Sequence, residues 1–211
     1  MPLKIKYSLK LEKQRLKNTI KKFSWFEKMG YAPRFPKNTN PKLDSLKKIY
    51  TALQCEYVEE DYEKAAIEIN KQFSRIENTF YDKLQRQCGK RIKRNFNLVL
   101  TKYGVGGSYS LPNKIIYNFQ MKSSSINTIM HEITHLTIEP YIKKYQIQQN
   151  EKERIVDLIL TSDIVALDYT MQKRGEQAGK IIDPLFKQYF KPPISVFFKE
   201  LQKTTSKHPK K

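Results

Sequence analysis

Two histidines four residues apart constrain this chain more than any other feature. His131 and His135 enclose Glu132, Ile133 and Thr134. On an α-helix, residues i and i+4 lie one turn apart on the same face, so the two imidazoles can bind one metal ion. Glu132 lies near that face, where its carboxylate can take a proton from a metal-bound water. We therefore expect a helix here, and a fold that brings at least one further ligand to it.

The scarcity of histidine restricts what that further ligand can be. A catalytic zinc site needs three protein ligands and an open position for water. The chain has three histidines in 211 residues, and the third, His208, lies in a basic C-terminal tail that we expect to be frayed. Cys55 and Cys88 lie far upstream in segments with helical patterns and are not spaced as a ligand pair. The third ligand is therefore expected to be a carboxylate.

Three glutamates downstream of the motif are candidates for this ligand. Glu153 forms an ExxxD pair with Asp157, which places both carboxylates on one helix face. Glu139 continues the face of the two histidines one turn further on. Pro140 disfavours helical geometry at Glu139, which can bend back toward the metal or cap the segment that follows. We rank Glu153 first, Glu139 second and Glu151 third.

HExxH followed by ExxxD resembles the zincin metallopeptidases, and among them the gluzincins, whose third ligand is a Glu on the next helix. The resemblance implies one Zn²⁺ per chain, held by His131, His135 and Glu153. It also implies that Asp157 binds the far nitrogen of a ligating histidine, which fixes its tautomer and raises its basicity. Other transition ions fit the same ligands, so the native metal is open. Alternatively, Glu153 and Asp157 are ordinary charges on a solvated helix face.

The order of the expected elements fits an α+β, zincin-like fold. This fold is mostly helical, with a small β-sheet beside the HExxH helix and a Glu-bearing helix after it. Ser123–Ser125 offer N-caps for the HExxH helix. A stretch rich in Pro and Asn, 32–41, suggests a basic helical extension and linker over 1–41 and a metallopeptidase domain over 42–211. We expect strands at 3–10, 95–103 and 114–119, and helices at 11–29, 42–87, 153–174 and 194–201.

Glycines interrupt the sequence between the two later strands. In zincins an extended peptide substrate pairs with the strand along the cleft, and Gly106 and Gly107 would let its backbone approach closely. A plain hairpin turn explains the same glycines equally well.

Charge and composition set the expected surroundings. The net charge is +19, and residues 1–48 carry fourteen basic and three acidic side chains. Nucleic acid or another anionic surface is a reasonable partner, although only eight of the forty basic residues are Arg, the usual residue for phosphate and base recognition. A merely solvated surface explains the charge equally well. Two cysteines, no signal-peptide pattern and no transmembrane segment predict a cytoplasmic protein.

These features predict a zinc metallopeptidase that hydrolyses a peptide or protein substrate, with metal-activated water and Glu132 as general base. The donor that stabilises the oxyanion is a Tyr or an Arg that no sequence feature singles out. The alternative is a basic zinc-containing domain that binds nucleic acid or another anionic partner without proteolysis. A DNA-associated protease would combine both functions.

Overall fold

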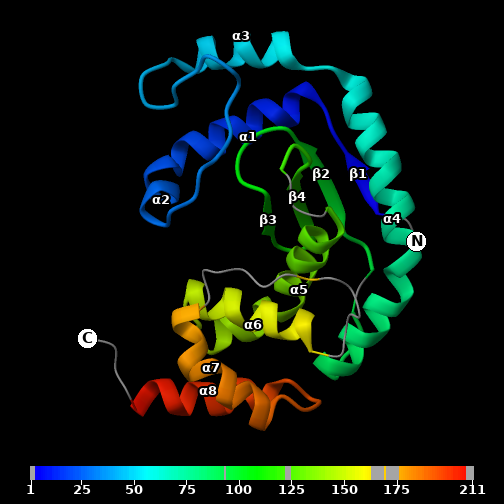
Figure 1. The fold of residues 1–211 in the computed structure, drawn as a ribbon, viewed down its shortest axis with the longest axis vertical. Helices are drawn as coiled ribbons and strands as arrows, with labels where there is room; N and C mark the ends of the chain where they lie inside the picture. The colour runs from blue at the N-terminus through cyan, green and yellow to red at the C-terminus, as the bar shows by residue number, and fades with distance from the viewer. Residues whose placement is uncertain (1–2, 93, 122–124, 163–168, 170–175, 208–211) are drawn as a thin grey trace. The chain divides into compact units, whose positions relative to one another are not determined.

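The computed structural model describes residues 3–92, 94–121, 125–162, 169 and 176–207 (Figure 1). In this described part the chain forms eight helices and one four-stranded sheet, which confirms a mostly helical α+β protein with a small sheet. Contacts divide the chain into two compact units, Met1–Arg75 with Asn95–Glu132, and Ile76–Arg94 with Ile133–Lys211. Residues on both sides of the predicted boundary at 41 belong to the first unit. None of the described helices has the length and hydropathy needed to span a membrane.

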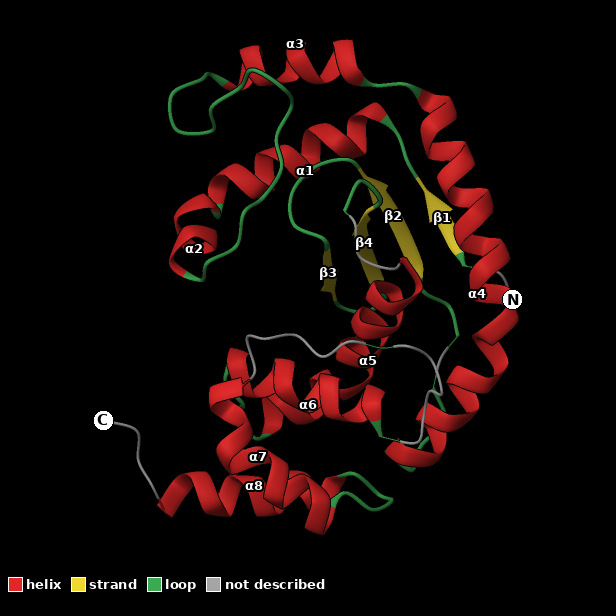
Figure 2. Ribbon diagram, in the orientation of Figure 1, coloured by secondary structure: helices red, strands yellow, loops and turns green. Residues whose placement is uncertain are grey.

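The sheet of the first unit has the order β1-β2-β4-β3 (Figure 2). β1, β2 and β4 run parallel, and β3 pairs antiparallel with β4 at one edge. The strands expected at 3–10, 95–103 and 114–119 correspond to β1, β2 and β4, whereas β3 was not expected. The strand bounds are Lys4–Lys6 for β1, Asn97–Thr101 for β2, Gly107–Ser110 for β3 and Lys114–Asn118 for β4.

The position of β3 tests one of the two interpretations of the glycines, the hairpin turn. The connection between β3 and β4 consists of residues 111–113, so Gly106 and Gly107 do not form that hairpin turn. Gly107 is instead the first residue of β3. The alternative of a plain hairpin turn is therefore wrong for these two glycines.

Serine caps and a small apolar cluster order the helices of the first unit. The Ser8 and Ser45 hydroxyls accept hydrogen bonds from backbone amides in the first turns of α1 and α3. Leu16 of α1 packs with Ile49 and Leu53 of α3 in a fully buried cluster. The helix expected at 11–29 is divided near Lys22, and the helical region expected at 42–87 forms two helices. Their bounds are Leu9–Lys21 for α1, Phe23–Lys28 for α2, Leu46–Glu56 for α3 and Glu59–Cys88 for α4.

A buried carboxylate joins α1 to the end of β2. Glu12 is 1% exposed and accepts hydrogen bonds from the Tyr62 hydroxyl at 2.5 Å, the Thr101 hydroxyl at 2.5 Å and the Lys102 backbone amide at 2.7 Å. Burial raises the pKa of Glu12, and the three donors, together with the charge of Arg15, oppose that rise. This network fixes the N-terminal helix against the sheet.

In the second unit, α7 contacts both α6 and α8. The Arg154 guanidinium of α6 donates to both carboxylate oxygens of Asp183 on α7, with Nε to Oδ1 at 2.8 Å. The helix expected at 153–174 begins earlier, at Gln149, and its expected continuation over 163–168 and 170–175 lies outside the described residues. The bounds are Gln149–Thr161 for α6, Glu176–Tyr189 for α7, which the sequence analysis missed, and Ser195–Lys207 for α8.

Replacing Glu12 with Gln tests the buried carboxylate. Because the pKa of Glu12 is raised on folding, the folded protein holds this proton more tightly than the unfolded chain, where the pKa of Glu is about 4.3. The wild-type free energy of unfolding should therefore fall, relative to that of Glu12→Gln, as the pH rises from about 4.3 through the raised pKa. Denaturant unfolding at several pH values measures the difference. A difference that stays constant over this range would contradict the prediction.

Candidate metal centre

The HExxH sequence lies on α5 (Ser125–Lys144), as predicted. Ten consecutive residues of this helix, 129–138, are buried. Because they are buried, the residues in and around the motif are uncharged apart from Glu132 and the two histidines. Ser125 is the first residue of the helix, and the other two predicted caps, Ser123 and Ser124, lie outside the described residues. The helix also continues through Pro140, so it does not end at Glu139.

Two imidazoles and one carboxylate converge in this region. Ligand atoms of His131, His135 and Glu153 all lie within 4.8 Å of one another, and all three residues are buried. The two histidines are one turn apart on α5, and Glu153 comes from the first half of α6. This is the one cluster of three or more potential metal ligands among the residues that the structure describes.

One distance within this cluster is close to that between two ligands of a single metal ion. The Nε2 atom of His135 lies 3.2 Å from Oε2 of Glu153. Two ligands bound about 2.1 Å from a tetrahedral metal are roughly 3.4 Å apart, so this separation is close to that of ligands sharing one ion. Imidazole nitrogen with carboxylate oxygen is also a donor set that zinc accepts. His131, His135 and Glu153 would be the residues that hold it.

Further side chains orient the acidic residues of α6. Gln149 lies one turn before Glu153 and donates its amide to Oε1 of Glu153 at 2.6 Å, which leaves Oε2 directed to His135. Asp157 is fully buried one turn after Glu153 and accepts a hydrogen bond from the Tyr169 hydroxyl at 2.5 Å. Neither Gln149 nor Tyr169 was predicted from the sequence. The i−4 spacing from Glu153 could have indicated Gln149, whereas nothing in the sequence points to Tyr169.

The other predicted ligand candidates lie elsewhere. Glu139 stays on α5, half-buried, and is not part of the described cluster. Glu151 accepts a hydrogen bond from the Gln148 backbone amide at 3.1 Å, so its carboxylate serves the N-terminus of α6. Cys55 on α3 and Cys88 on α4 are also outside the cluster. His208 lies outside the described residues.

Glu132 faces the start of the edge strand β3. A Cβ atom added to Gly107 would lie 2.4 Å from Oε1 of Glu132 and 2.7 Å from Cγ2 of Thr128, so a side chain at Gly107 has no room. A Cβ added to Gly106 would meet nothing closer than Cγ of Met121 at 3.8 Å, an ordinary contact distance. The missing side chain at Gly107 therefore lets the strand backbone approach the Glu132 carboxylate.

Arg15 of α1 holds the segment that leads into β3. Its guanidinium donates to the Val105 carbonyl at 3.3 Å and to the Ser108 hydroxyl at 3.1 Å. Burial lowers the pKa of Arg15, while the negative charges of Glu12 and Glu132 oppose that shift. An arginine keeps its charge in proteins, so Arg15 is a half-buried cation between two carboxylates. No local pattern points to Arg15, because it lies more than ninety positions from Ser108 along the chain.

Substituting the two glycines separately tests the close approach. In Gly107→Ala the new methyl group overlaps Glu132 and Thr128, and we expect the free energy of unfolding to fall by about 1–3 kcal/mol, as for other overpacked sites. Gly106→Ala, which meets only Met121, is the matched control and should change stability by less than about 0.5 kcal/mol. Denaturant unfolding measures both variants. Equal losses of unfolding free energy in the two variants would contradict the close approach of Gly107 to Glu132.

Comparisons with protein-family models, with curated proteins and with solved structures found no significant match to this chain. What the site can do therefore follows from its own chemistry. It combines two imidazoles on one helix, a carboxylate from the next helix and a further carboxylate, Glu132, directly after the first histidine.

Proposed function

We propose that this chain is a zinc-dependent peptidase of the gluzincin type. The observation that carries the proposal is the buried cluster of His131, His135 and Glu153, with Glu132 on the same helix. A structural zinc site is usually closed by four protein ligands, whereas a catalytic site uses three and keeps one position open. The three-member cluster and its neighbouring carboxylate favour the catalytic alternative.

Each residue of the site has a distinct task in this proposal. Bound zinc supplies a Lewis acid that polarises the scissile carbonyl and makes water more acidic. Glu132 accepts a proton from the attacking water and then delivers it to the leaving amine, acting first as general base and then as general acid. Gln149 positions the Glu153 carboxylate through its hydrogen bond to Oε1. Asp157, buried on α6 one turn after Glu153, is proposed to orient a ligating histidine.

The edge strand β3 suggests how a substrate binds. β3 pairs with β4 on one side, and no described strand pairs with its other edge. An extended peptide can add to such an edge through backbone hydrogen bonds. Because Gly107 brings this strand against Glu132, a peptide bound there would have its backbone near the proposed general base. We therefore propose an extended peptide or protein segment as the substrate.

Metal analysis of purified variants tests the ligand set. We expect one zinc per wild-type chain, and loss of most of it in His131→Ala, His135→Ala and Glu153→Ala, since each removes one of three ligands. Glu139→Ala is the matched control, because Glu139 lies on α5 outside the cluster, and it should keep its zinc. Inductively coupled plasma mass spectrometry gives the metal content. Retention of zinc in Glu153→Ala together with its loss in Glu139→Ala would reverse the assignment of the third ligand.

Glu132→Gln separates metal binding from hydrolysis. The amide is nearly isosteric but cannot accept the water proton, so we expect normal zinc content and a fall in peptide turnover of at least about 10²-fold. Turnover is measured on a library of fluorogenic peptides, with wild-type protein stripped of metal as the second control. Wild-type activity in pure Glu132→Gln would refute this role. Zinc in the wild type without cleavage of any peptide would instead favour a non-proteolytic zinc-containing domain.

A further inference from the structure

The surface formed by the first 48 residues is almost entirely cationic. Twelve of the fourteen basic side chains in this segment are exposed. Arg15 and Glu12 are in its interior, where their charges offset one another. The remaining acids, Glu27 and Asp44, are paired with Lys42 and Lys48 at 2.7 and 2.8 Å. A partner that approaches this segment therefore meets lysine ammonium groups with little opposing charge.

A tight turn in this segment presents leucine to solvent. Asn40 organises the turn: its carbonyl accepts from the backbone amides of Leu43 at 3.2 Å and Asp44 at 2.9 Å. Its side-chain oxygen accepts from the Lys42 amide at 2.9 Å. Leu43 is 83% exposed and Leu46, the first residue of α3, is 40% exposed. We name the group Lys42, Leu43, Leu46 and Lys47 the Leu43 tip.

The one acidic side chain of the turn is held by hydrogen bonds within the segment. Asp44 accepts from the Asn40 backbone amide at 2.6 Å and from the Lys48 ammonium at 2.8 Å, and its side chain is 13% exposed. These hydrogen bonds, first that from Lys48, lower the pKa of Asp44, which keeps the carboxylate ionised and engaged. The turn thus holds exposed leucine side chains beside exposed lysine side chains.

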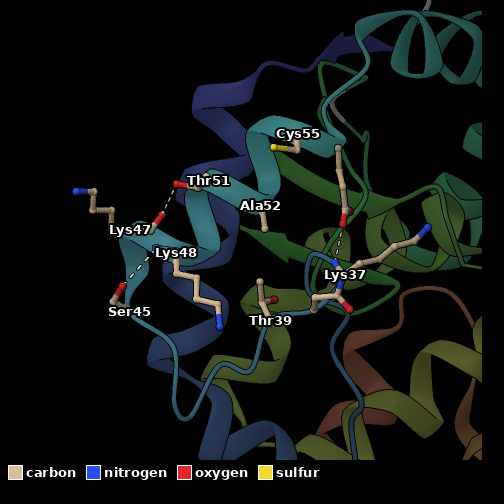
Figure 3. A pocket seen from close by; sticks show the side chains of 10 residues that line it. Lys37, Thr39, Ser45, Lys47, Lys48, Thr51, Ala52 and Cys55 are labelled. Atoms are coloured by element: carbon tan, nitrogen blue, oxygen red, sulfur yellow. Dashed lines mark hydrogen bonds between the residues drawn. The ribbon is translucent and has the colours of Figure 1, made fainter.

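A pocket beside the tip does not explain the lysines. The cavity, of about 710 Å³, lies between α3 and residues 37–39 and is lined in part by Lys37, Lys47 and Lys48. In Figure 3 the side chains of Lys37 and Lys47 extend in opposite directions, so their ammonium groups do not converge on one small anion. The charge is spread over a surface, which suits an extended anionic partner.

We propose that the Leu43 tip docks this chain onto an anionic lipid bilayer. Such a surface offers negative headgroups to the lysines and, a few ångströms below, hydrocarbon for Leu43 and Leu46. Nucleic acid would satisfy the lysines through its phosphates, but it binds through phosphate, base edges and stacking, and offers no apolar layer for two aliphatic side chains. The indole of Trp25 on α2, 44% exposed, is a further amphipathic side chain that the first 48 residues present to solvent.

Vesicle co-sedimentation of the full chain tests the proposal. We expect binding to phosphatidylcholine vesicles that contain about a third phosphatidylserine, weaker binding at about 0.5 M salt, and little binding to pure phosphatidylcholine. Replacing both leucines of the tip, Leu43→Ser with Leu46→Ser, should weaken the partition coefficient by at least about tenfold, because the charge stays and the apolar contact is lost.

A matched control separates this effect from a general loss of apolar surface. Ile67 on α4 is 69% exposed and lies among the acidic residues Glu63 and Glu68, so Ile67→Ser should bind vesicles like the wild type. Circular dichroism verifies that all variants are folded. The proposal is overturned if the wild type does not bind phosphatidylserine vesicles, or if the double leucine variant binds them equally well. Binding of a single-stranded oligonucleotide with no vesicle binding would also overturn it, and would make nucleic acid the partner.

Discussion

The approach of the Glu153 carboxylate to the His135 imidazole is the constraint on which the candidate site depends. Both groups are buried, and a buried carboxylate is costly unless hydrogen bonds or a cation compensate for the lost water. Gln149 satisfies one oxygen at 2.6 Å and leaves the other, at 3.2 Å from the imidazole, directed into the cluster. A divalent cation at that point would compensate the carboxylate and use both imidazoles. The buried acidic side chains of α6 are therefore consistent with a metal centre and are difficult to explain by packing alone.

A second set of buried charges organises the sheet around Glu132. Arg15 lies between Glu12, which anchors α1 to the end of β2, and the segment that leads into β3. Through Ser108 it fixes the strand whose first residue, Gly107, lies against Glu132. Residues 1–41 thus contribute a strand, two helices and a half-buried arginine to the unit that contains the proposed general base. Substitutions in α1 should consequently affect the edge strand β3.

Local patterns predicted the parts of the site that local geometry determines. The i, i+4 spacing placed both histidines on one helix face, and ExxxD identified the carboxylate that the fold brings to them. Strand β3 escaped prediction because Gly-Ser-Tyr-Ser has little intrinsic strand propensity and is held by pairing with β4. Arg15 and Tyr169 escaped because their partners are brought close only by the tertiary fold. The continuation of α5 through Pro140 shows that the fold overrides a local helix breaker.

The residues around the cluster favour a catalytic interpretation over a purely structural one. A metal that only stabilises a fold gains from a fourth protein ligand and needs no further carboxylate beside it. In the described part of the chain the cluster has three members, and Glu132 follows the first of them directly on the helix. Gly107 leaves room for this carboxylate against an edge strand that can accept an extended chain. A structural site would use neither the space nor the strand edge, whereas the proposed hydrolysis of an extended peptide would use both.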